Sequence, residues 1–214
     1  MHFLITAGGT REYIDPVRFI SNASSGRMGY ALALAAIKAG HKVTLVSASD
    51  LQPLVGVDFV GVDSAAEMFE AVKKFFSKCD CLIMAAAVAD YTPLRPAKHK
   101  IKKTGESLTI KLKPTTDILK WAGKHKKVKN KKAKSKRQIV VGFALEDKAL
   151  RKQAEQKLKE KNLDMIIANT PAAIGSDKAA VEIKTGGGKW LRLRKAGKTI
   201  VAKKIIADIE NITW

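Results

Sequence analysis

The sequence has few of the residues that cross-link small secreted proteins or build metal centres. It contains 2 cysteines, Cys79 and Cys81, and its 4 histidines are scattered along the chain. On a strand the two cysteines would lie about 6.6 Å apart on one face, at the outer limit of disulfide reach, so we expect no bond between them. No cysteine or histidine stands at metal-ligand spacing, so the cysteines are interpreted as plain thiols and no metal ligand is assigned.

Long hydrophobic runs and a charged leader are also missing. No apolar run is long enough to span a membrane, and the N-terminus passes directly into a strand-like run at residues 3–6. We therefore expect a cytoplasmic protein. At 214 residues, with 46% hydrophobic and 28% charged residues, the chain suits a single domain, residues 1–214, with a well-buried core.

The net charge of +20 is concentrated in one part of the chain. Residues 1–90 carry 8 basic and 9 acidic residues, residues 91–137 carry 17 and 2, and residues 138–214 carry 15 and 9. The stretch 124–137 alone has 9 Lys and Arg and no acidic residue, which is typical of a solvated, mobile connector. Because this stretch has no Phe, Tyr or Trp to stack on bases, a nucleic-acid-binding Rossmann-like protein is the weaker alternative.

The most informative stretch is residues 3–34, which has the pattern of a strand, a polar loop at 11–25 and a helix. Small residues that suit contact with phosphate mark both ends of the loop: Gly8, Gly9, Ser24, Ser25 and Gly26. Unpaired N–H groups at the helix start favour an anion, and glycine lets a phosphate approach the backbone. In an ordinary strand–helix loop a serine would only cap the helix. Such loops usually have about 2–6 residues, so this alternative does not account for the length of 11–25.

The same stretch differs from the dinucleotide-binding fingerprint. The compact G-x-G-x-x-G motif is absent, since Gly9 and Gly26 lie far apart in the sequence. The second expected strand, 43–46, ends in Ser47 instead of an acidic residue that would bind an adenosine ribose. A nicotinamide-dependent reductase is therefore disfavoured, and the pattern predicts a nucleotide-phosphate site of another kind.

Strand-like and helix-like segments alternate along the rest of the chain. Strands are expected at 59–62, 82–88, 139–144 and 164–169, helices at 65–77, 147–161 and 199–212, and a hairpin over 180–194. Ser64 and Glu67 have the S-x-x-E spacing of a capping box at the start of the 65–77 helix. A flap or arm is expected at about 93–114, with an exposed strand at 108–112. Together these predict a three-layer, Rossmann-like α/β fold with a mostly parallel sheet, a protruding arm, and a C-terminal β-hairpin plus helix. Ligands of such sheets lie at the carboxyl ends of strands, which is where Asp90 follows the 82–88 strand.

Six segments together resemble the phosphopantothenoylcysteine synthetase domain of the bacterial DNA/pantothenate metabolism flavoprotein family. They are ITAGGTREYIDPVRFISNASSGRMG (5–29), AAAVADYTP (85–93), KIKK (100–103), DIL (117–119), VGFALE (141–146) and KNLDMIIAN (161–169). Two features depart from the family pattern. The 124–137 stretch is longer and richer in lysine, and Lys113 stands where many bacterial relatives have an asparagine before the proline.

The resemblance implies a coenzyme A biosynthesis ligase that joins 4′-phosphopantothenate to L-cysteine. The substrate carboxylate would attack the α-phosphate of CTP, giving an acyl-cytidylate and pyrophosphate, and the cysteine amine would then displace CMP. The resemblance also implies Mg²⁺, a homodimer in which the arm strand crosses to the partner, and a separate flavin-dependent phosphopantothenoylcysteine decarboxylase as a possible partner. An ATP-using version of the same ligase stays open, because eukaryotic relatives prefer ATP.

Residue roles follow from the same resemblance. The two catalytic candidates are Asn22, which would contact the acyl-nucleotide intermediate, and Lys100, which would neutralise phosphates from a flexible flap. Asp15 would have a positioning role in a dimer-facing loop. Expected nucleotide-binding residues are Gly8, Gly9, Asp15, Ser24, Ser25, Gly26, Met84, Ala85, Ala86, Asp90, Thr116, Asp117, Ile118, Leu119, Phe143, Lys157 and Lys161.

Overall fold

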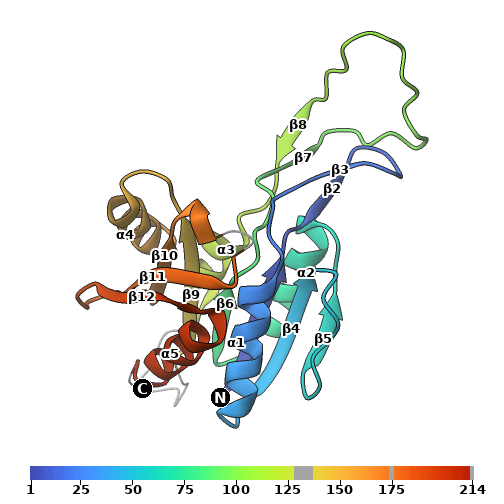
Figure 1. Ribbon diagram of the computed structural model, residues 1–214. Helices are drawn as coiled ribbons and strands as arrows, with labels where there is room; N and C mark the ends of the chain where they lie inside the picture. The colour runs from blue at the N-terminus through green and yellow to red at the C-terminus, as the bar shows by residue number, and fades with distance from the viewer. Residues whose placement is uncertain (128–136, 174–175, 213–214) are drawn as a thin grey trace.

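A computed structural model describes residues 1–127, 137–173 and 176–212 (Figure 1). In chain order its elements are β1 (His2–Gly8), β2 (Arg11–Tyr13), β3 (Phe19–Ser21), α1 (Arg27–Lys38), β4 (Lys42–Ala48), β5 (Asp58–Gly61), α2 (Ala65–Phe76), β6 (Cys81–Met84), β7 (Tyr91–Pro93), β8 (Leu112–Pro114), α3 (Ile118–His125), β9 (Ile139–Leu145), α4 (Leu150–Glu160), β10 (Met165–Asn169), a 3₁₀ turn (Pro171–Ala173), β11 (Lys178–Thr185), β12 (Leu191–Gly197) and α5 (Lys198–Glu210). None of the described helices is both long and apolar enough to cross a membrane.

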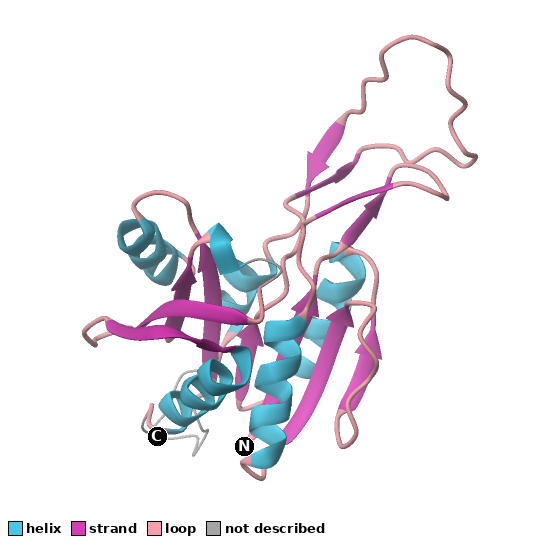
Figure 2. Ribbon diagram, in the orientation of Figure 1, coloured by secondary structure: helices cyan, strands magenta, loops and turns pink. Residues whose placement is uncertain are grey.

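A single 8-stranded sheet, in the order β12-β11-β10-β9-β6-β1-β4-β5, forms the centre of the molecule. The six strands from β10 to β5 are parallel, and the β11–β12 hairpin adds two antiparallel strands at one edge. Helices α1 and α5 pack on one face, whereas α2, α3 and α4 pack on the other (Figure 2). This confirms the predicted three-layer, mostly parallel α/β fold.

Residues of the central strands alternate between the two faces of the sheet. In β1, Phe3 and Ile5 pack into the α1–α5 layer, and Leu4 packs into the layer formed by α2, α3 and α4. All three side chains are fully buried. A strand covered on both faces has apolar residues at most positions, which explains the nearly continuous apolar runs in β1, β6 and β9.

The strand expected at 82–88 is shorter than predicted, because β6 ends at Met84. Beyond it the chain bends to hydrogen-bond with the last part of β1 and the loop that follows. Ala86 N–H donates to Thr6 Oγ1 (3.1 Å), Ala87 N–H donates to the Gly8 carbonyl (2.8 Å), and Ala89 N–H donates to Thr10 Oγ1 (2.9 Å). These bonds come from distant residues, so the apolar run alone did not reveal where the strand stops.

The 11–25 segment is also not a simple loop. Its first part forms the β2–β3 hairpin, in which Tyr13 and Phe19 pack edge to face with ring centroids 5.5 Å apart. The arm prediction holds in outline: residues between β7 and β8 project far from the sheet (Figure 1). The strand expected at 108–112 is displaced to Leu112–Pro114, where β8 pairs with β7 at the base of the arm.

The starts of helices α2 and α4 are set by residues next to them in the sequence. At α2 the Ser64 side chain accepts a hydrogen bond from Glu67 N–H (3.2 Å), as the S-x-x-E spacing predicts. The Glu67 carboxylate in turn accepts from Asp63 N–H (2.7 Å). Helix α4 begins at Leu150, later than the 147 expected, because Ala149 adopts a left-handed conformation with φ 49°.

The basic 124–137 stretch is only partly a connector. Helix α3 extends to His125, and Lys126 Nζ donates to Asp164 Oδ2 at 2.9 Å. Arg137 pairs with the other carboxylate oxygen of Asp164. The two ends of the stretch are therefore fixed to one carboxylate, and residues 128–136, on which the prediction of mobility mainly rests, lie outside the described residues.

Candidate functional site

A cavity of about 550 Å³ lies at the carboxyl ends of β6, β9 and β10. Its lining also comes from the segments that open α1, α3 and α5, and from α4. Of the residues expected at a nucleotide site it contains Asn22, Ser24, Ser25, Gly26, Met84, Ala85, Ala86, Asp90, Thr116, Asp117, Ile118, Leu119, Phe143, Lys157 and Lys161. Segments far apart in the sequence thus meet around one space, at the place where α/β sheets bind ligands.

Four expected residues do not line this cavity: Gly8, Gly9, Asp15 and Lys100. The two glycines allow chain segments to approach each other. A Cβ on Gly8 would lie 2.6 Å from the Ala48 carbonyl carbon, and a Cβ on Gly9 would lie 2.6 Å from the Asn22 carbonyl oxygen. They therefore shape the loops beside the cavity, and a part for them in binding phosphate stays a prediction.

Asp15 anchors the arm. Its buried carboxylate pairs with Arg18 and accepts hydrogen bonds from Val17 N–H (2.9 Å) and Ile101 N–H (3.1 Å). The Arg18 guanidinium and these backbone donors hold the pKa of Asp15 well below its usual range, although burial opposes ionisation. Because Arg18 also donates to the Ile101 carbonyl (2.8 Å), the segment beside Lys100 is fixed to the β2–β3 turn.

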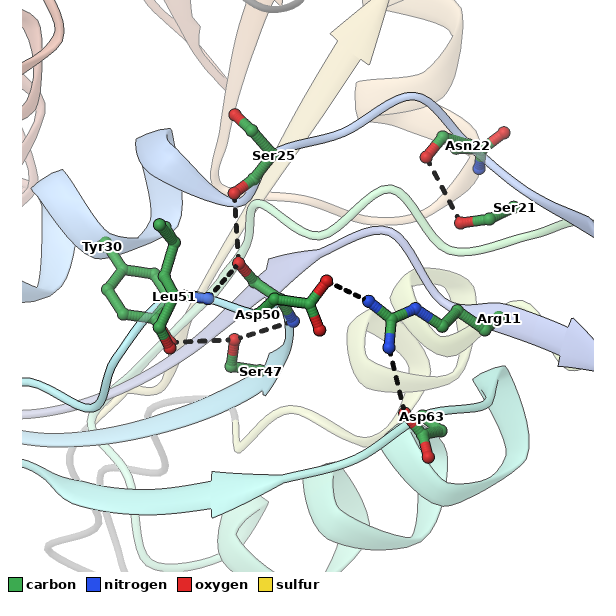
Figure 3. Close-up of polar contacts among 10 residues, drawn as sticks. Arg11, Ser21, Asn22, Ser25, Tyr30, Ser47, Asp50, Leu51 and Asp63 are labelled. Carbon is green, nitrogen blue, oxygen red and sulfur yellow. Dashed lines mark hydrogen bonds and ion pairs between the residues drawn. The ribbon is translucent and has the colours of Figure 1, made fainter. Parts of the chain in front are cut away.

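The loop from Asn22 to Gly26 is held in place by the segment at the end of β4 (Figure 3). The Ser25 carbonyl accepts a hydrogen bond from Ser49 Oγ (3.1 Å), and Ser49 N–H donates to Ser47 Oγ (3.1 Å). Gly26 has φ 76° and a Cβ there would lie 2.7 Å from the Ser49 Cβ, so only glycine suits this position. Neither Ser24 nor Ser25 caps α1, whose start has no side-chain cap, so the capping alternative does not hold.

Asn22 occupies the edge of the cavity between the loop and the end of β6. Its Nδ2 donates to the Ala87 carbonyl (3.2 Å) and to the Val88 carbonyl (3.1 Å). The amide is therefore oriented by the backbone that follows β6. To donate to a bound acyl-nucleotide, it has to exchange one of these two bonds.

One group of charges comes from α3 and α4. Asp117 caps α3 by accepting from Lys120 N–H (2.9 Å), and it pairs with Lys161 (2.8 Å). Burial is the largest single effect and opposes ionisation of Asp117, but Lys161 and the Lys120 N–H together outweigh it and the pKa of Asp117 is lowered. The pKa of Lys157 is lowered by its burial and by neighbouring Lys161. Lys157 is the more available cation of this pair, since Lys161 is already neutralised.

A second group of charges comes from the starts of α1 and α5, and the sequence analysis did not assign it. Arg27 and Lys198 both line the cavity, and Arg27 pairs with Asp177 at 2.5 Å. Arg27 was visible within the SSGRMG motif, whereas Lys198 stands in a stretch without any local signal. Ala87, which the strand end also predicted to face a ligand, lines the cavity as well. Other lining residues that the sequence did not single out are Ala23, Met28, Gly29, Val88, Thr115, Leu145, Asn169 and Ala179.

The described residues do not build a metal site of their own. Within 1–127, 137–173 and 176–212 no three His, Cys, Asp or Glu side chains are grouped to hold a metal ion. Asp90 and Asp117 are the carboxylates that line the cavity, and Asp117 is engaged by Lys161. This arrangement suits a metal ion that arrives with a phosphate ligand better than a resident one.

Gly123 sets the close contact between α3 and the end of α4. A Cβ there would lie 1.8 Å from the Lys161 carbonyl oxygen. We expect Gly123→Ala to force the helices apart, to destabilise the fold by about 1–3 kcal/mol and to weaken nucleotide binding by displacing Lys161. Denaturant unfolding and nucleotide titration measure the two effects. Gly187→Ala is the control, because a Cβ there meets nothing within 4 Å; equal stability of both variants would contradict the prediction.

The fold and the cavity define a class of Rossmann-like α/β proteins with a pocket at the carboxyl edge of the sheet, lined in part by lysine and arginine side chains. The family described as DNA/pantothenate metabolism flavoprotein C-terminal domain matches residues 1–212. The chain belongs to this family, which confirms the family predicted from the six motifs.

Individual relatives agree with this assignment. The chain is 44% identical over 218 residues to the coenzyme A biosynthesis bifunctional protein CoaBC of Bacillus subtilis, covering 99% of this chain and 52% of the relative. It is 51% identical over 168 residues to a cysteine/cysteine sulfinic acid decarboxylase from an unknown prokaryotic organism, covering 78% and 45%. The crystal structure of the C-terminal domain of CoaBC superposes with a TM-score of 0.80 at 39% identity, covering 99% of this chain and 94% of that one.

The chain spans about half the length of the curated relatives it matches. An activity in a relative's name can therefore belong to the part outside the match. The names alone do not assign an activity to this chain.

Proposed function

We propose that the protein is a phosphopantothenate–cysteine ligase that acts through an acyl-cytidylate. The observation that carries the proposal is the cavity itself, which gathers Asn22, the α1 start, Lys157 and Lys161 around one space. These are the residues that the family resemblance assigns to the nucleotide and the intermediate. Membership of a family with relatives named for coenzyme A biosynthesis supports the same activity.

In the first step a carboxylate oxygen of 4′-phosphopantothenate attacks the α-phosphorus of CTP. The bond between that phosphorus and the bridging oxygen breaks, and pyrophosphate leaves with the electron pair. Negative charge on the transferred cytidylyl group is stabilised by Lys157, and N–H groups at the start of α1 stabilise charge elsewhere on the phosphates. Asn22 donates to an oxygen of the acyl phosphate, exchanging a bond to the Ala87 or Val88 carbonyl.

In the second step the amine of L-cysteine attacks the acyl carbon. The bond from that carbon to the phosphate oxygen breaks, CMP leaves, and the amine proton passes to solvent. Retention of the anhydride in one cavity makes this attack effectively intramolecular, which lowers the entropic part of the barrier.

We assign CTP as the nucleotide and Mg²⁺ as a metal ion that enters with its phosphates. Asp90 suits such a metal ion, since Mg²⁺ is commonly held by one or two carboxylates plus substrate phosphates. Ala85 and Ala86 lie at the end of β6 and Phe143 lies on β9, and the three would border the base. Substitution of Ala86 by Leu is expected to change the ratio of kcat/KM for CTP and ATP.

The test is a reconstituted reaction with 4′-phosphopantothenate, L-cysteine, Mg²⁺ and either CTP or ATP. We expect one pyrophosphate and one CMP for each amide formed, and pyrophosphate release with accumulation of the anhydride when cysteine is omitted. Faster turnover with ATP would identify the ATP-using version. Absence of amide with both nucleotides would overturn the proposal. Parallel titrations with NADPH and a short oligonucleotide at two salt concentrations examine the reductase and nucleic-acid alternatives.

We propose that Lys100, which lies on the arm, neutralises the phosphates of the nucleotide. Lys100 does not line the cavity of its own chain in this structure, so it must reach the phosphates either by movement of the arm or across a dimer. We expect Lys100→Gln to slow amide formation severely while the fold is kept. Activity of mixed dimers of this variant and Asn22→Ala then shows whether Lys100 acts at the cavity of its own chain or at that of the partner. Recovered activity would place it over the partner's cavity, and no recovery would require movement of the arm over its own. Wild-type turnover of Lys100→Gln would exclude it from catalysis.

We further propose a homodimer formed through the arm. Exposed large apolar side chains lie on the arm and on the β2–β3 hairpin beside its base: Tyr13, Val17, Phe19, Tyr91, Leu94, Leu108 and Leu112. Such a patch is unusual on the surface of a monomer. A separate decarboxylase is a possible further partner.

The arm variant Leu108→Glu, combined with Leu112→Glu, is expected to shift the sedimentation coefficient from dimer to monomer, since charges would be buried without partners. Val55→Glu, at a residue that is 96% exposed elsewhere, should leave the dimer intact. A dimer that survives the double substitution would rule out the arm as the interface.

A further inference from the structure

The proposed chemistry leaves two cations of the cavity unused: Arg27, the first residue of α1, and Lys198, the first residue of α5. The two helices lie side by side on the same face of the sheet (Figure 1). Their starts therefore bring both side chains to one end of the cavity. This end is separate from Lys157 and Lys161, which come from α4 and the opposite helix layer.

Neither cation is firmly neutralised. Arg27 Nη1 pairs with Asp177 at 2.5 Å, but the Asp177 side chain is 84% exposed, so this pair contributes little. Lys198 Nζ forms no ion pair or hydrogen bond with any residue that the structure describes. Burial lowers the pKa of Lys198, and the neighbouring Arg27 adds to this. Two cations that repel each other at a concave surface provide an attractive position for an anion.

The backbone at the starts of α1 and α5 adds to the positive charge of Arg27 and Lys198 at this end of the cavity. Gly26 and Gly197 precede α1 and α5, and neither helix has a side-chain cap at its start. Lys198 N–H donates to the Asp177 carbonyl (3.0 Å), but the partial positive charge at both helix starts remains directed at this end of the cavity.

The charges at the two ends of the cavity fit different parts of a nucleoside triphosphate. At the α3–α4 end Asp117 already offsets Lys161, so that end suits the single charge of an α-phosphate. At the α1–α5 end two cations face one exposed carboxylate. We propose that Arg27 and Lys198 bind the two terminal phosphates of the nucleotide and stabilise them as they leave as pyrophosphate.

This proposal rests on the nucleotidyl transfer proposed above. When the carboxylate oxygen bonds to the α-phosphorus, the bond to the bridging oxygen breaks and its electron pair stays on pyrophosphate. Charge therefore develops on the leaving group, where Arg27 and Lys198 lie. The cysteine step, in which pyrophosphate has gone, should not depend on either residue.

Direct binding provides the first test. The full chain is titrated calorimetrically with inorganic pyrophosphate and, separately, with CMP. We expect Arg27→Gln and Lys198→Gln each to lose about 10–100-fold in pyrophosphate affinity, as for loss of a charge-assisted hydrogen bond, and to keep CMP affinity. Lys203→Gln removes the same charge from an exposed position of α5 and should bind both like wild type. Unchanged pyrophosphate binding by the Arg27 and Lys198 variants, or an equal loss of CMP, would overturn the proposal.

A second variant separates binding from a structural role of the Arg27–Asp177 pair. Asp177→Asn removes that pair but leaves both cations. It should bind pyrophosphate as well as wild type or more tightly. If Asp177→Asn loses as much affinity as Arg27→Gln, the ion pair only supports the fold and the proposal fails.

Rates of the two half-reactions complete the test. Pyrophosphate release without cysteine should fall about 10–100-fold in the Arg27 and Lys198 variants, whereas aminolysis of the isolated anhydride should be unchanged. If wild type forms no amide but its pyrophosphate binding still depends on these residues, the ligase proposal fails and the anion site stands. If amide forms and pyrophosphate binding is insensitive to both residues, the ligase proposal stands and the proposed roles of Arg27 and Lys198 fail.

Discussion

Replacement of Asn22 by Ala is expected to lower the rate of acyl-nucleotide formation by about 10²–10³, the usual loss when one preorganised donor is removed. The side chain stands at the edge of the cavity with its amide directed at the Ala87 and Val88 carbonyls. These contacts fix its rotamer before substrate arrives. Pyrophosphate release in single-turnover experiments without cysteine measures the effect on the first step.

The same two hydrogen bonds could also serve only to hold the loop in place, and the kinetic constants distinguish the roles. A donor to the intermediate lowers kcat with little change in nucleotide affinity, whereas a loosened loop weakens CTP binding and stability. Ser21→Ala is the matched control, because Ser21 belongs to the same segment and, among the described residues, its hydroxyl hydrogen-bonds only with the Asn22 carbonyl (3.3 Å). We expect that variant to stay within about threefold of wild type. Asn22→Ala with unchanged turnover would remove Asn22 from the mechanism.

Much of the fold could be predicted because its signals are local. Strands β6 and β9 are buried on both faces, and this requirement leaves a continuous apolar run in the sequence. The Ser64–Glu67 spacing fixed the start of α2 for a similar reason, since cap and first turn are adjacent in the chain. The family motifs then supplied most of the cavity lining.

The features that were missed depend on contacts between distant segments. The end of β6 is set by Thr6 and Thr10, which are polar residues of another strand and its loop. Arg27 and Lys198 share the cavity only because α1 packs beside α5. The 11–25 segment looked like a loop because β2 and β3 have three residues each, too few for an alternating pattern to be recognised.

The lysine-rich stretch gives the clearest example of such a contact. Its composition predicted a solvated connector, yet Lys126 and Arg137 both contact Asp164, whose side chain is 1% exposed. Asp164 also accepts a hydrogen bond from Val140 N–H at 2.9 Å. One buried carboxylate therefore joins the two ends of the stretch to the amino ends of β9 and β10, a role that composition cannot reveal.

We expect Asp164→Asn to destabilise the protein by about 3–5 kcal/mol, since it leaves two cations, one of them almost buried, without their counter-charge. For a chain of this size that corresponds to a decrease in Tm on the order of 10 °C. Asp58→Asn is the control, because Asp58 pairs with Lys42 at 3.3 Å on the surface and should contribute less than about 1 kcal/mol. Denaturant unfolding compares the two.

The effect of Asp164→Asn should be confined to stability, because this residue and the cavity lie at opposite ends of β10. The strand begins at Met165, next to Asp164, and ends at Asn169, which lines the cavity. Below its unfolding temperature the variant should therefore bind CTP and turn over within about twofold of wild type, since sites that share no partners are nearly independent. A decrease of less than about 1 kcal/mol in the free energy of unfolding would mean that the Asp164 ion pairs contribute no more than ordinary surface ion pairs. Loss of turnover in the folded variant would instead show that the basic stretch is coupled to the cavity across the sheet.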